Sequence, residues 1–136
     1  MTFTQILGTS NFYKASAGHD FTLALDKDGA VWGFGQNDDG QLGLGDNTKR
    51  TIPTRINFAI PVAMISTGNL HSLLLDQNGI VWSFGKNKFC QLGQKDSQSR
   101  NIPCKVPDLS DIVQISSGHY HNLLVSASGK VYGFGS

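Results

Sequence analysis

Several features that would point to particular classes of protein are missing from this chain of 136 residues. All ten acidic residues are aspartates, since glutamate is absent, and no Asn-x-Ser/Thr glycosylation sequon occurs. No apolar run approaches the roughly 20 residues of a membrane-spanning helix. The N-terminus lacks the charged start and apolar core of a signal peptide. We therefore expect an intracellular protein, cytoplasmic or nuclear, that does not enter a membrane.

Charge and cysteine are also sparse. Eleven Lys and Arg residues against ten Asp leave a net charge of +1, without the basic excess that direct nucleic-acid binding needs. Cys90 and Cys104 stand alone with no Cys-x-x-Cys pair, which fits a reducing compartment and predicts no zinc site. The chain does have 16 scattered glycines, too many for long helices. This composition favours an all-β protein.

The chain repeats itself with a period of 50 residues, and the register holds without gaps. The aligned motifs are Ser16-Ala17-Gly18, Ser66-Thr67-Gly68 and Ser116-Ser117-Gly118, and then Val31-Trp32-Gly33-Phe34-Gly35, Val81-Trp82-Ser83-Phe84-Gly85 and Val131-Tyr132-Gly133-Phe134-Gly135. Because a missed repeat misassigns the whole fold, this periodicity sets the domain organisation. We divide a single repeat domain, 1–136, into units 16–65 and 66–115 with partial units 1–15 and 116–136.

Each unit reads as four short strands. A β-branched strand is followed by Gly and by an apolar strand, and a turn such as Asp26-Lys27-Asp28-Gly29 then leads to a strand carrying the aromatic residues. A polar loop separates these from a proline-bearing segment that we expect to be an edge strand. Four strands in a unit of this size are typical of a β-propeller blade. We expect structural roles for the recurring residues of the units. The glycines should lie where strands crowd near the propeller axis: Gly18, Gly68 and Gly118. The aromatic residues should lie in the core: Trp32, Trp82 and Tyr132.

Two motifs resemble the repeat of the regulator of chromosome condensation family. One is the run Ser-x-Gly-x-x-His-Ser-Leu-Leu-Leu-Asp-x-x-Gly-x-Val-Trp-Ser-Phe-Gly-x-Asn that begins at Ser66, and the other is Gly40-Gln41-Leu42-Gly43. The resemblance covers nearly the whole chain and implies blades of a seven-bladed β-propeller. The family includes an exchange factor for the GTPase Ran, ubiquitin-ligase domains and ciliary scaffolds, so the fold alone does not choose a function.

The chain departs from the family pattern at three places, one of which is Gln94-Lys95 in place of Leu44-Gly45. The histidine of the Gly-x-x-His element is kept as His71 and His121, but Phe21 replaces it in the first unit. Cys90 stands where the first unit has Gly40. No insertion comparable to the projecting β-wedge through which the founding member engages Ran is found, so exchange activity does not carry over with the resemblance.

The chain holds about three blades against the seven of a closed family ring. Met1–Ile6 aligns with Thr51–Ile56, the fourth strand of a unit, and the chain stops just after a third strand. The sequence therefore predicts a partial propeller. Its missing blades would belong to a longer parent chain, the alternative we favour, or to other copies that close a ring together.

Sites for chemistry are not indicated by the sequence. His19 and His119 share one repeat position and His71 and His121 another, so they lie on different blades and we assign them to structural hydrogen bonds. Asp26-x-Asp28-Gly29 lacks the remaining ligands of a calcium loop. Gly33-Phe34-Gly35 lacks the third glycine and the helix of a dinucleotide site. We predict no catalytic, metal-binding or cofactor-binding residue and no enzyme activity.

The two long loops are the best candidates for recognition, because loops on a rigid scaffold carry function. In residues 36–50, Lys49 and Arg50 against three aspartates give a charge of −1, and in residues 86–100 four basic residues against one aspartate give +3. Such a bipolar rim could orient a protein partner, or pair one copy with another. The candidate partner-binding residues are Asp38, Asp39, Asp46, Lys86, Lys88, Phe89 and Lys95.

These observations predict a non-enzymatic propeller module that serves as a scaffold for protein–protein interaction. Two alternatives remain open. One is a guanine-nucleotide exchange or regulatory factor for a Ran-like small GTPase, and the other is a propeller-type enzyme inhibitor. The expected partners are proteins, a small GTPase among the candidates, and further propeller blades; neither a membrane nor direct nucleic-acid binding is expected.

Overall fold

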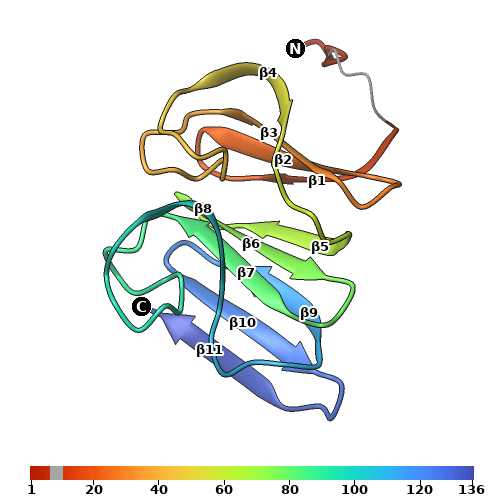
Figure 1. Cartoon of the computed structure of the whole chain (residues 1–136). Coiled ribbons are helices and arrows are strands. Elements are labelled where there is room, and N and C mark those ends of the chain that lie inside the picture. Colours follow the sequence, from red (N-terminus) through yellow and green to blue (C-terminus); the bar gives the residue numbers. More distant parts are fainter. Residues whose placement is uncertain (7–10) are drawn as a thin grey trace.

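Hydrogen-bonded strands recur along the chain with the period seen in the sequence (Figure 1). The computed structural model describes residues 1–6 and 11–136, and the described residues contain strands and no helix. The first sheet comprises β1 (Phe12–Ala17), β2 (Phe21–Asp26), β3 (Val31–Gly35) and β4 (Arg50–Arg55). The second comprises β5 (Val62–Thr67), β6 (His71–Asp76), β7 (Val81–Gly85) and β8 (Arg100–Lys105). The third comprises β9 (Ile112–Ser117), β10 (His121–Ser126) and β11 (Val131–Gly135).

Each sheet is an antiparallel meander whose strands pair in chain order. The proline-bearing strands β4 and β8 lie at the sheet edges, as predicted, and their pairing with β3 and β7 shifts register near Pro53 and Pro103. A proline lacks the N–H that a ladder needs, so an interior place in the sheet would leave a neighbour unpaired. The repeat units that the sequence analysis starts at residues 16, 66 and 116 therefore begin near the end of the first strand of each sheet, which is β1, β5 or β9.

The predicted hairpin turns are confirmed between β2 and β3 and between β6 and β7. Asp26 Oδ1 accepts hydrogen bonds from the N–H groups of Asp28 and Ala30 at 2.9 and 3.0 Å, and Oδ2 accepts one from Trp32 Nε1 at 3.0 Å. Gly29 completes the turn at φ +85°, a conformation that favours glycine. Asp76 repeats the pattern with Trp82. One carboxylate thus ties the turn to the aromatic strand.

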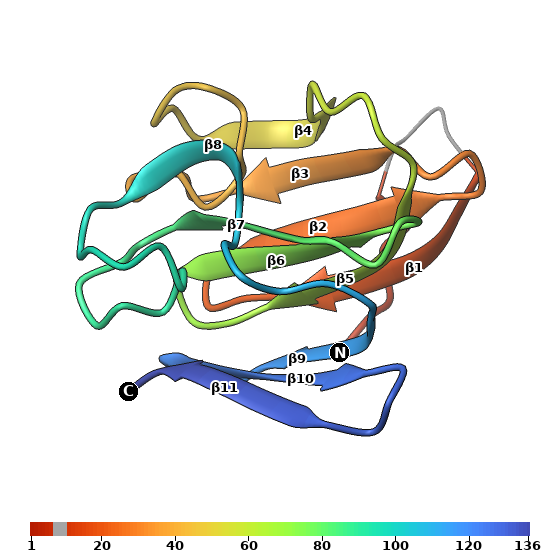
Figure 2. The same ribbon diagram turned by 60° about the horizontal axis from the view of Figure 1, so that its bottom comes forward.

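The three sheets stack face to face, as Figure 2 shows, and the core lies between them. Apolar side chains fill the space between the first and second sheets, among them Leu23, Leu25, Leu74 and Phe84. A second cluster that includes Leu73, Val81, Ile115 and Leu124 fills the space between the second and third sheets. Both faces of the second sheet are covered, so apolar and polar residues alternate little along its strands. The all-β, partial-propeller prediction is confirmed.

The recurring glycines make room for a ring three residues further on. A Cβ on Gly68 would collide with the ring of His71 and would lie 2.7 Å from the carbonyl oxygen of Gly118 in the next sheet. Gly18 has the same relation to Phe21, and Gly118 to His121. The crowding thus comes from the side chain of the same unit and, at Gly68, from the backbone of the next.

The third sheet has one face without a neighbouring sheet. Leu123 is 50% exposed and Val131 65%, whereas their counterparts Leu23, Leu73, Val31 and Val81 are at most 2% exposed. Residues 1–6, which align with a fourth strand, form no strand and are exposed. Ile6 nevertheless lines a hollow on the outer face of the first sheet. No helix in the described part of the chain is long and apolar enough to cross a membrane.

Candidate interaction surface

The long loops and the short β1–β2, β5–β6 and β9–β10 turns lie at one end of the sheets. This follows from the meander, in which successive connections alternate between the two ends. In Figure 1 these segments are on the left, and the β2–β3, β6–β7 and β10–β11 hairpins are on the right. We call the end formed by loops 36–50 and 86–100 and the three short turns the loop face.

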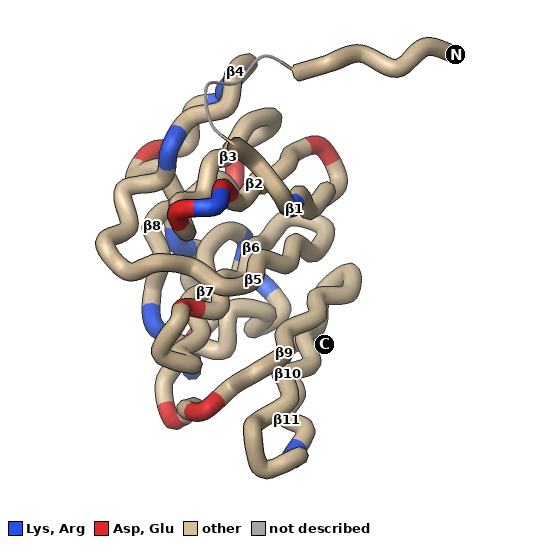
Figure 3. Tube along the Cα trace, turned by 90° about the vertical axis from the view of Figure 1, so that its right-hand side faces the viewer, with Lys and Arg blue, Asp and Glu red and all other residues tan. Residues whose placement is uncertain are grey.

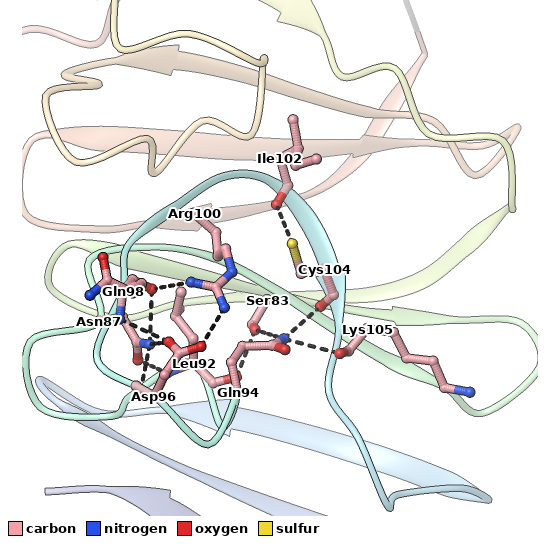
Figure 4. Close-up of polar contacts among 10 residues, drawn as sticks. All are labelled: Ser83, Asn87, Leu92, Gln94, Asp96, Gln98, Arg100, Ile102, Cys104 and Lys105. Atoms are coloured by element: carbon pink, nitrogen blue, oxygen red, sulfur yellow. Dashed lines mark hydrogen bonds and ion pairs between the residues drawn. The ribbon is translucent and has the colours of Figure 1, made fainter.

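A buried asparagine gives both long loops the same shape. Asn37 Nδ2 donates to the carbonyl oxygens of Asp46 and Thr48, and its Oδ1 accepts the N–H of Leu42 at 3.0 Å. Asn87 makes the equivalent bonds in the second loop (Figure 4). Because each asparagine is fully buried, the loops are fixed from within and can present residues to a partner with little loss of entropy.

An ion pair closes each loop. Asp46 Oδ2 accepts a hydrogen bond from Arg50 Nη2 at 2.7 Å, and Asp96 and Arg100 do the same in the second loop at 2.7 Å. Hydrogen bonds from Arg50 and from the Thr48 N–H lower the pKa of Asp46, and those from Arg100 and the Gln98 N–H lower that of Asp96. Asp46, one of the predicted partner-binding residues, is therefore occupied in shaping its own loop.

The second loop replaces two glycines of the first. Cys90 (φ 57°) and Lys95 (φ 62°) stand at the positions of Gly40 (φ 80°) and Gly45 (φ 84°). Gln94 ties this loop to β8 in compensation, donating to Ser83 Oγ and to the carbonyl oxygens of Cys104 and Lys105 at 3.0–3.2 Å (Figure 4). The first loop instead rests on the second unit, where Gly45 N–H donates to Asn101 O at 2.8 Å.

Most of the opposite charges on the two loops are paired inside the chain. Lys86 Nζ lies 3.8 Å from Asp39 Oδ1 and so joins the two loops, and Lys95 Nζ lies 2.6 Å from Asp108 Oδ2. Figure 3 shows the two signs of charge interspersed along the trace. The Lys86–Asp39 pair thus joins neighbouring units, and the Lys95–Asp108 pair lies within one unit. Asp38 and Lys88 are exposed.

Aromatic rings meet on the loop face between the second and third units. The ring of Phe89, 39% exposed, lies 4.7 Å from that of Tyr120, which lies 4.1 Å from the ring of His119. Lys88 Nζ is 5.6 Å from the Phe89 ring centre. The sequence analysis named Phe89 and Lys88 as candidate partner-binding residues and did not name Tyr120, which lies beside Phe89. The repeat holds Asp20 and Leu70 at that position, and this variation was the available signal.

His71 lies where the second and third sheets meet. Asn122 Nδ2 donates to Gln91 O at 2.6 Å, so Asn122 Oδ1 is the acceptor that faces His71 Nε2 at 2.8 Å. Burial lowers the pKa of His71; the bond to Asn122 acts in the opposite direction, and the charge of His121 acts with burial. The His71 ring is thus neutral, with its proton on Nε2, and joins two units rather than the ends of one turn.

Among the described residues, no three His, Cys, Asp or Glu side chains are grouped as metal ligands would be. His19 bonds to its neighbour Asp20 at 2.7 Å on the surface, and His119 stacks on Tyr120. These two histidines share a repeat position but not an environment. The arrangement offers contact surface and hydrogen-bonding groups.

Known proteins with the same repeat agree with this structure. The model of the regulator of chromosome condensation (RCC1) repeat matches residues 28–75 and 78–125. A probable E3 ubiquitin-protein ligase of Homo sapiens, HERC6, is 39% identical over 61 residues, which are 43% of this chain and 6% of that protein. The chain spans less than a tenth of the length of that relative.

Two solved structures share the fold. Human WBSCR16 superposes with a TM-score of 0.85 at 22% identity, over 93% of this chain and 33% of the other. Prp20p of Saccharomyces cerevisiae superposes with a TM-score of 0.83 at 23% identity, over 92% and 33%; that structure was described together with binding to Gsp1p and histones. Repeat motif, blade architecture and family match agree, and the chain belongs to the RCC1 repeat family.

Proposed function

We propose that this chain is the repeat segment of a β-propeller that binds a protein partner through its loop face and carries out no chemistry itself. The observation that supports this most directly is the pair of loops held rigid by Asn37 and Asn87, each fully buried. A rigid loop loses little entropy on binding, so its exposed residues can contribute their full contact energy.

The contact would centre on Phe89 and Lys88. Aromatic residues are enriched at energetically dominant positions of protein interfaces, and Phe89 already rests on Tyr120, so its ring is held in place. Lys88 has its Nζ near the Phe89 ring and would set the charge preference toward an acidic group on the partner. Asp38, Asp39, Lys86 and Lys95 belong to the same two loops, where Lys86 pairs with Asp39 and Lys95 with Asp108.

A selection with a matched counter-selection tests the proposal. Displayed protein domains are selected on the wild-type chain and counter-selected on the variant Lys88→Glu/Phe89→Ser, and each clone is then measured by calorimetry. We expect clones whose Kd rises about tenfold or more on the variant, as for loss of one dominant contact. Lys27→Glu, an exposed change in the β2–β3 hairpin at the opposite end, should leave Kd unchanged. Clones that bind all three proteins equally would contradict the proposal.

Exchange activity on a small GTPase is the second candidate. It is favoured by the likeness to Prp20p, whose structure was described with its binding to Gsp1p. The assay is release of fluorescent GDP from a Ran-type GTPase in the presence of the chain. Acceleration that Lys88→Glu/Phe89→Ser abolishes would favour exchange over a passive scaffold; binding without acceleration would favour the scaffold.

A further inference from the structure

A cavity lies in the loop face, where the first unit meets the second. Asp39 and Asn47 of loop 36–50 line one side of it, and Arg100, Asn101 and Ile102 at the start of β8 line the other. Its volume is about 360 Å³, and ligand sites in proteins begin at about 300 Å³. The cavity is therefore large enough to receive part of a binding partner.

Contacts between the two units hold the walls of this cavity in place. Gly45 N–H donates to Asn101 O at 2.8 Å, and Asn101 Nδ2 donates to Asn47 Oδ1 at 3.1 Å. Loop 36–50 approaches β8 closely at Gly40, where a Cβ would lie 2.7 Å from Asn101 Cα. The walls are thus shaped before a ligand arrives, and binding does not have to order them.

Asp39 carries the least compensated charge of the cavity. Among the described residues its carboxylate accepts no hydrogen bond, and Lys86 Nζ approaches Oδ1 only to 3.8 Å, beyond hydrogen-bond distance. The Asp46 and Asp96 carboxylates, by contrast, each accept a hydrogen bond of 2.7 Å from an arginine. The Asp39 side chain is only 27% exposed, so solvent ions screen its charge less than that of a fully exposed carboxylate.

Arg100, the cation among the lining residues, is already compensated. Its Nη2 donates to Asp96 Oδ2 and its Nη1 to Gln98 O, both at 2.7 Å (Figure 4). An anion in the cavity would meet this occupied guanidinium on one side and the Asp39 carboxylate on the other. The charges of the lining therefore favour a cation.

The uncharged lining residues add an acceptor and an apolar surface. Asn47 Nδ2 donates to Asp38 O at 2.8 Å, which fixes Asn47 Oδ1 as the acceptor for Asn101 Nδ2. Asn101 Oδ1 is then left as a further acceptor. Ile102 is 53% exposed, and its Cγ2 lies 3.9 Å from where a Cβ of Gly45 would be. Its side chain can pack against the methylene stem of a long basic residue.

We propose that this cavity receives an arginine side chain of the protein that the loop face binds. A guanidinium has a planar set of donors, so it can bond to the Asp39 carboxylate and to Asn101 Oδ1 together while its stem packs on Ile102. The inference rests on the proposed function, because the partner supplies the arginine. Asp39 and Phe89 share a repeat position, so the partner carries this arginine one unit away from the group that meets Phe89.

A probe of a single residue tests the cavity without the partner. N-acetyl-arginine amide is titrated into the isotope-labelled chain, and NMR follows the backbone amides of Gly45, Asn101 and Ile102. N-acetyl-citrulline amide is the matched control, because it has the same shape without the charge. We expect the arginine probe to bind with a Kd about tenfold or more below that of the citrulline probe, as for a hydrogen bond to a charged group. Equal binding of both probes, or no shift up to their solubility limit, would overturn the proposal.

Three variants show whether Asp39 is the anchor. Asp39→Asn should raise the Kd of the arginine probe about tenfold. Asp38→Asn removes the same charge from an exposed neighbour that does not line the cavity and should change Kd by about twofold at most. Lys86→Gln removes the competing cation and should lower Kd about threefold, a direction that a merely structural role of the ion pair would not give. Equal effects of the two aspartate changes, or weaker binding in Lys86→Gln, would contradict the assignment.

The arginine site and the proposed function can fail separately. If the probe binds through Asp39 while the selection yields no clone that depends on Phe89, the arginine site stands and the proposed function is wrong. If clones depend on Phe89 while the probe leaves the amide signals unchanged, the proposed function stands and the arginine site is wrong.

Discussion

The two junctions between sheets use different chemistry at the same repeat position. At the junction of the first and second sheets, Phe21 stands at this position and belongs to the buried apolar cluster, and Ser72 of the next unit donates to Gln41 O. The junction of the second and third sheets pairs His71 with Asn122 and Gln91 O in a buried hydrogen-bonded relay. A repeat position can thus be satisfied by packing or by a polar pair, provided that both partners change together.

The polar pair has the greater cost when it is broken. His71 is fully buried, and its Nδ1 has no hydrogen-bond partner. In a buried site a lost partner leaves the full desolvation penalty of the orphaned group. At the first junction removal of the Ser72 hydroxyl leaves only one carbonyl, Gln41 O, without this donor.

The largest expected effect is therefore that of Asn122→Ala. It leaves both His71 Nε2 and Gln91 O unpaired, and we expect the free energy of unfolding to fall by about 2–4 kcal/mol. Ser72→Ala is the matched change at the first junction and should cost about 1 kcal/mol. Urea unfolding followed by tryptophan fluorescence gives both values. Equal losses at the two junctions would remove the distinction between them.

Exchange of the pair should rescue most of that loss. His71→Phe/Asn122→Ser reproduces the first junction at the second, where Gly68 leaves room for the ring as Gly18 does. We expect the double variant to be about 1–2 kcal/mol more stable than the sum of the two single changes predicts, a coupling in the range seen for contacting residues. Additive effects in this double-mutant cycle would mean that the two positions do not recognise each other.

Lowering the pH should destabilise the junction of the second and third sheets, because His71 lies there and can take up a proton. The first junction has Phe21 at the same repeat position and should show no such effect. Burial lowers the pKa of His71 in the folded chain, so the unfolded chain binds the proton first. Stability is then fully present above about pH 6.5, the ordinary histidine pKa, and falls as pH drops below it toward the lowered folded pKa. The double variant His71→Phe/Asn122→Ser should lose this part of the slope. Urea titrations from pH 7.5 to 5 measure it, and an unchanged slope would contradict the assignment.

The smallest effect is expected in the loops. Cys90 adopts a left-handed conformation that costs a non-glycine residue about 1 kcal/mol, so Cys90→Gly should stabilise the chain by about that amount. Gly40→Ala is the reverse change in the first loop and should destabilise it, because a Cβ there would lie 2.7 Å from Asn101 Cα. Thermal unfolding compares the two. Destabilisation by Cys90→Gly would show that the thiol makes a contact that offsets the strain.

The sequence predicted the strands, the hairpin turns and the edge position of the proline strands because these depend on neighbours a few residues apart. It did not predict that Lys86 meets Asp39 or that Lys95 meets Asp108, because these ion pairs depend on how sheets and loops pack. The hydrogen bond between His71 and Asn122 joins residues 51 apart. Comparison at 50 residues alone hides it.

The most direct test of the two-junction account is NMR titration of the His71 imidazole in the folded chain. The account predicts a neutral ring with its proton on Nε2 and a pKa below the ordinary 6.5. In Asn122→Ser the preference for the Nε2 proton should be lost, whereas the pKa should remain low, because burial lowers it and the bond to Asn122 raises it. A ring that carries its proton on Nδ1, or that titrates at or above 6.5, would contradict the relay from His71 through Asn122 to Gln91.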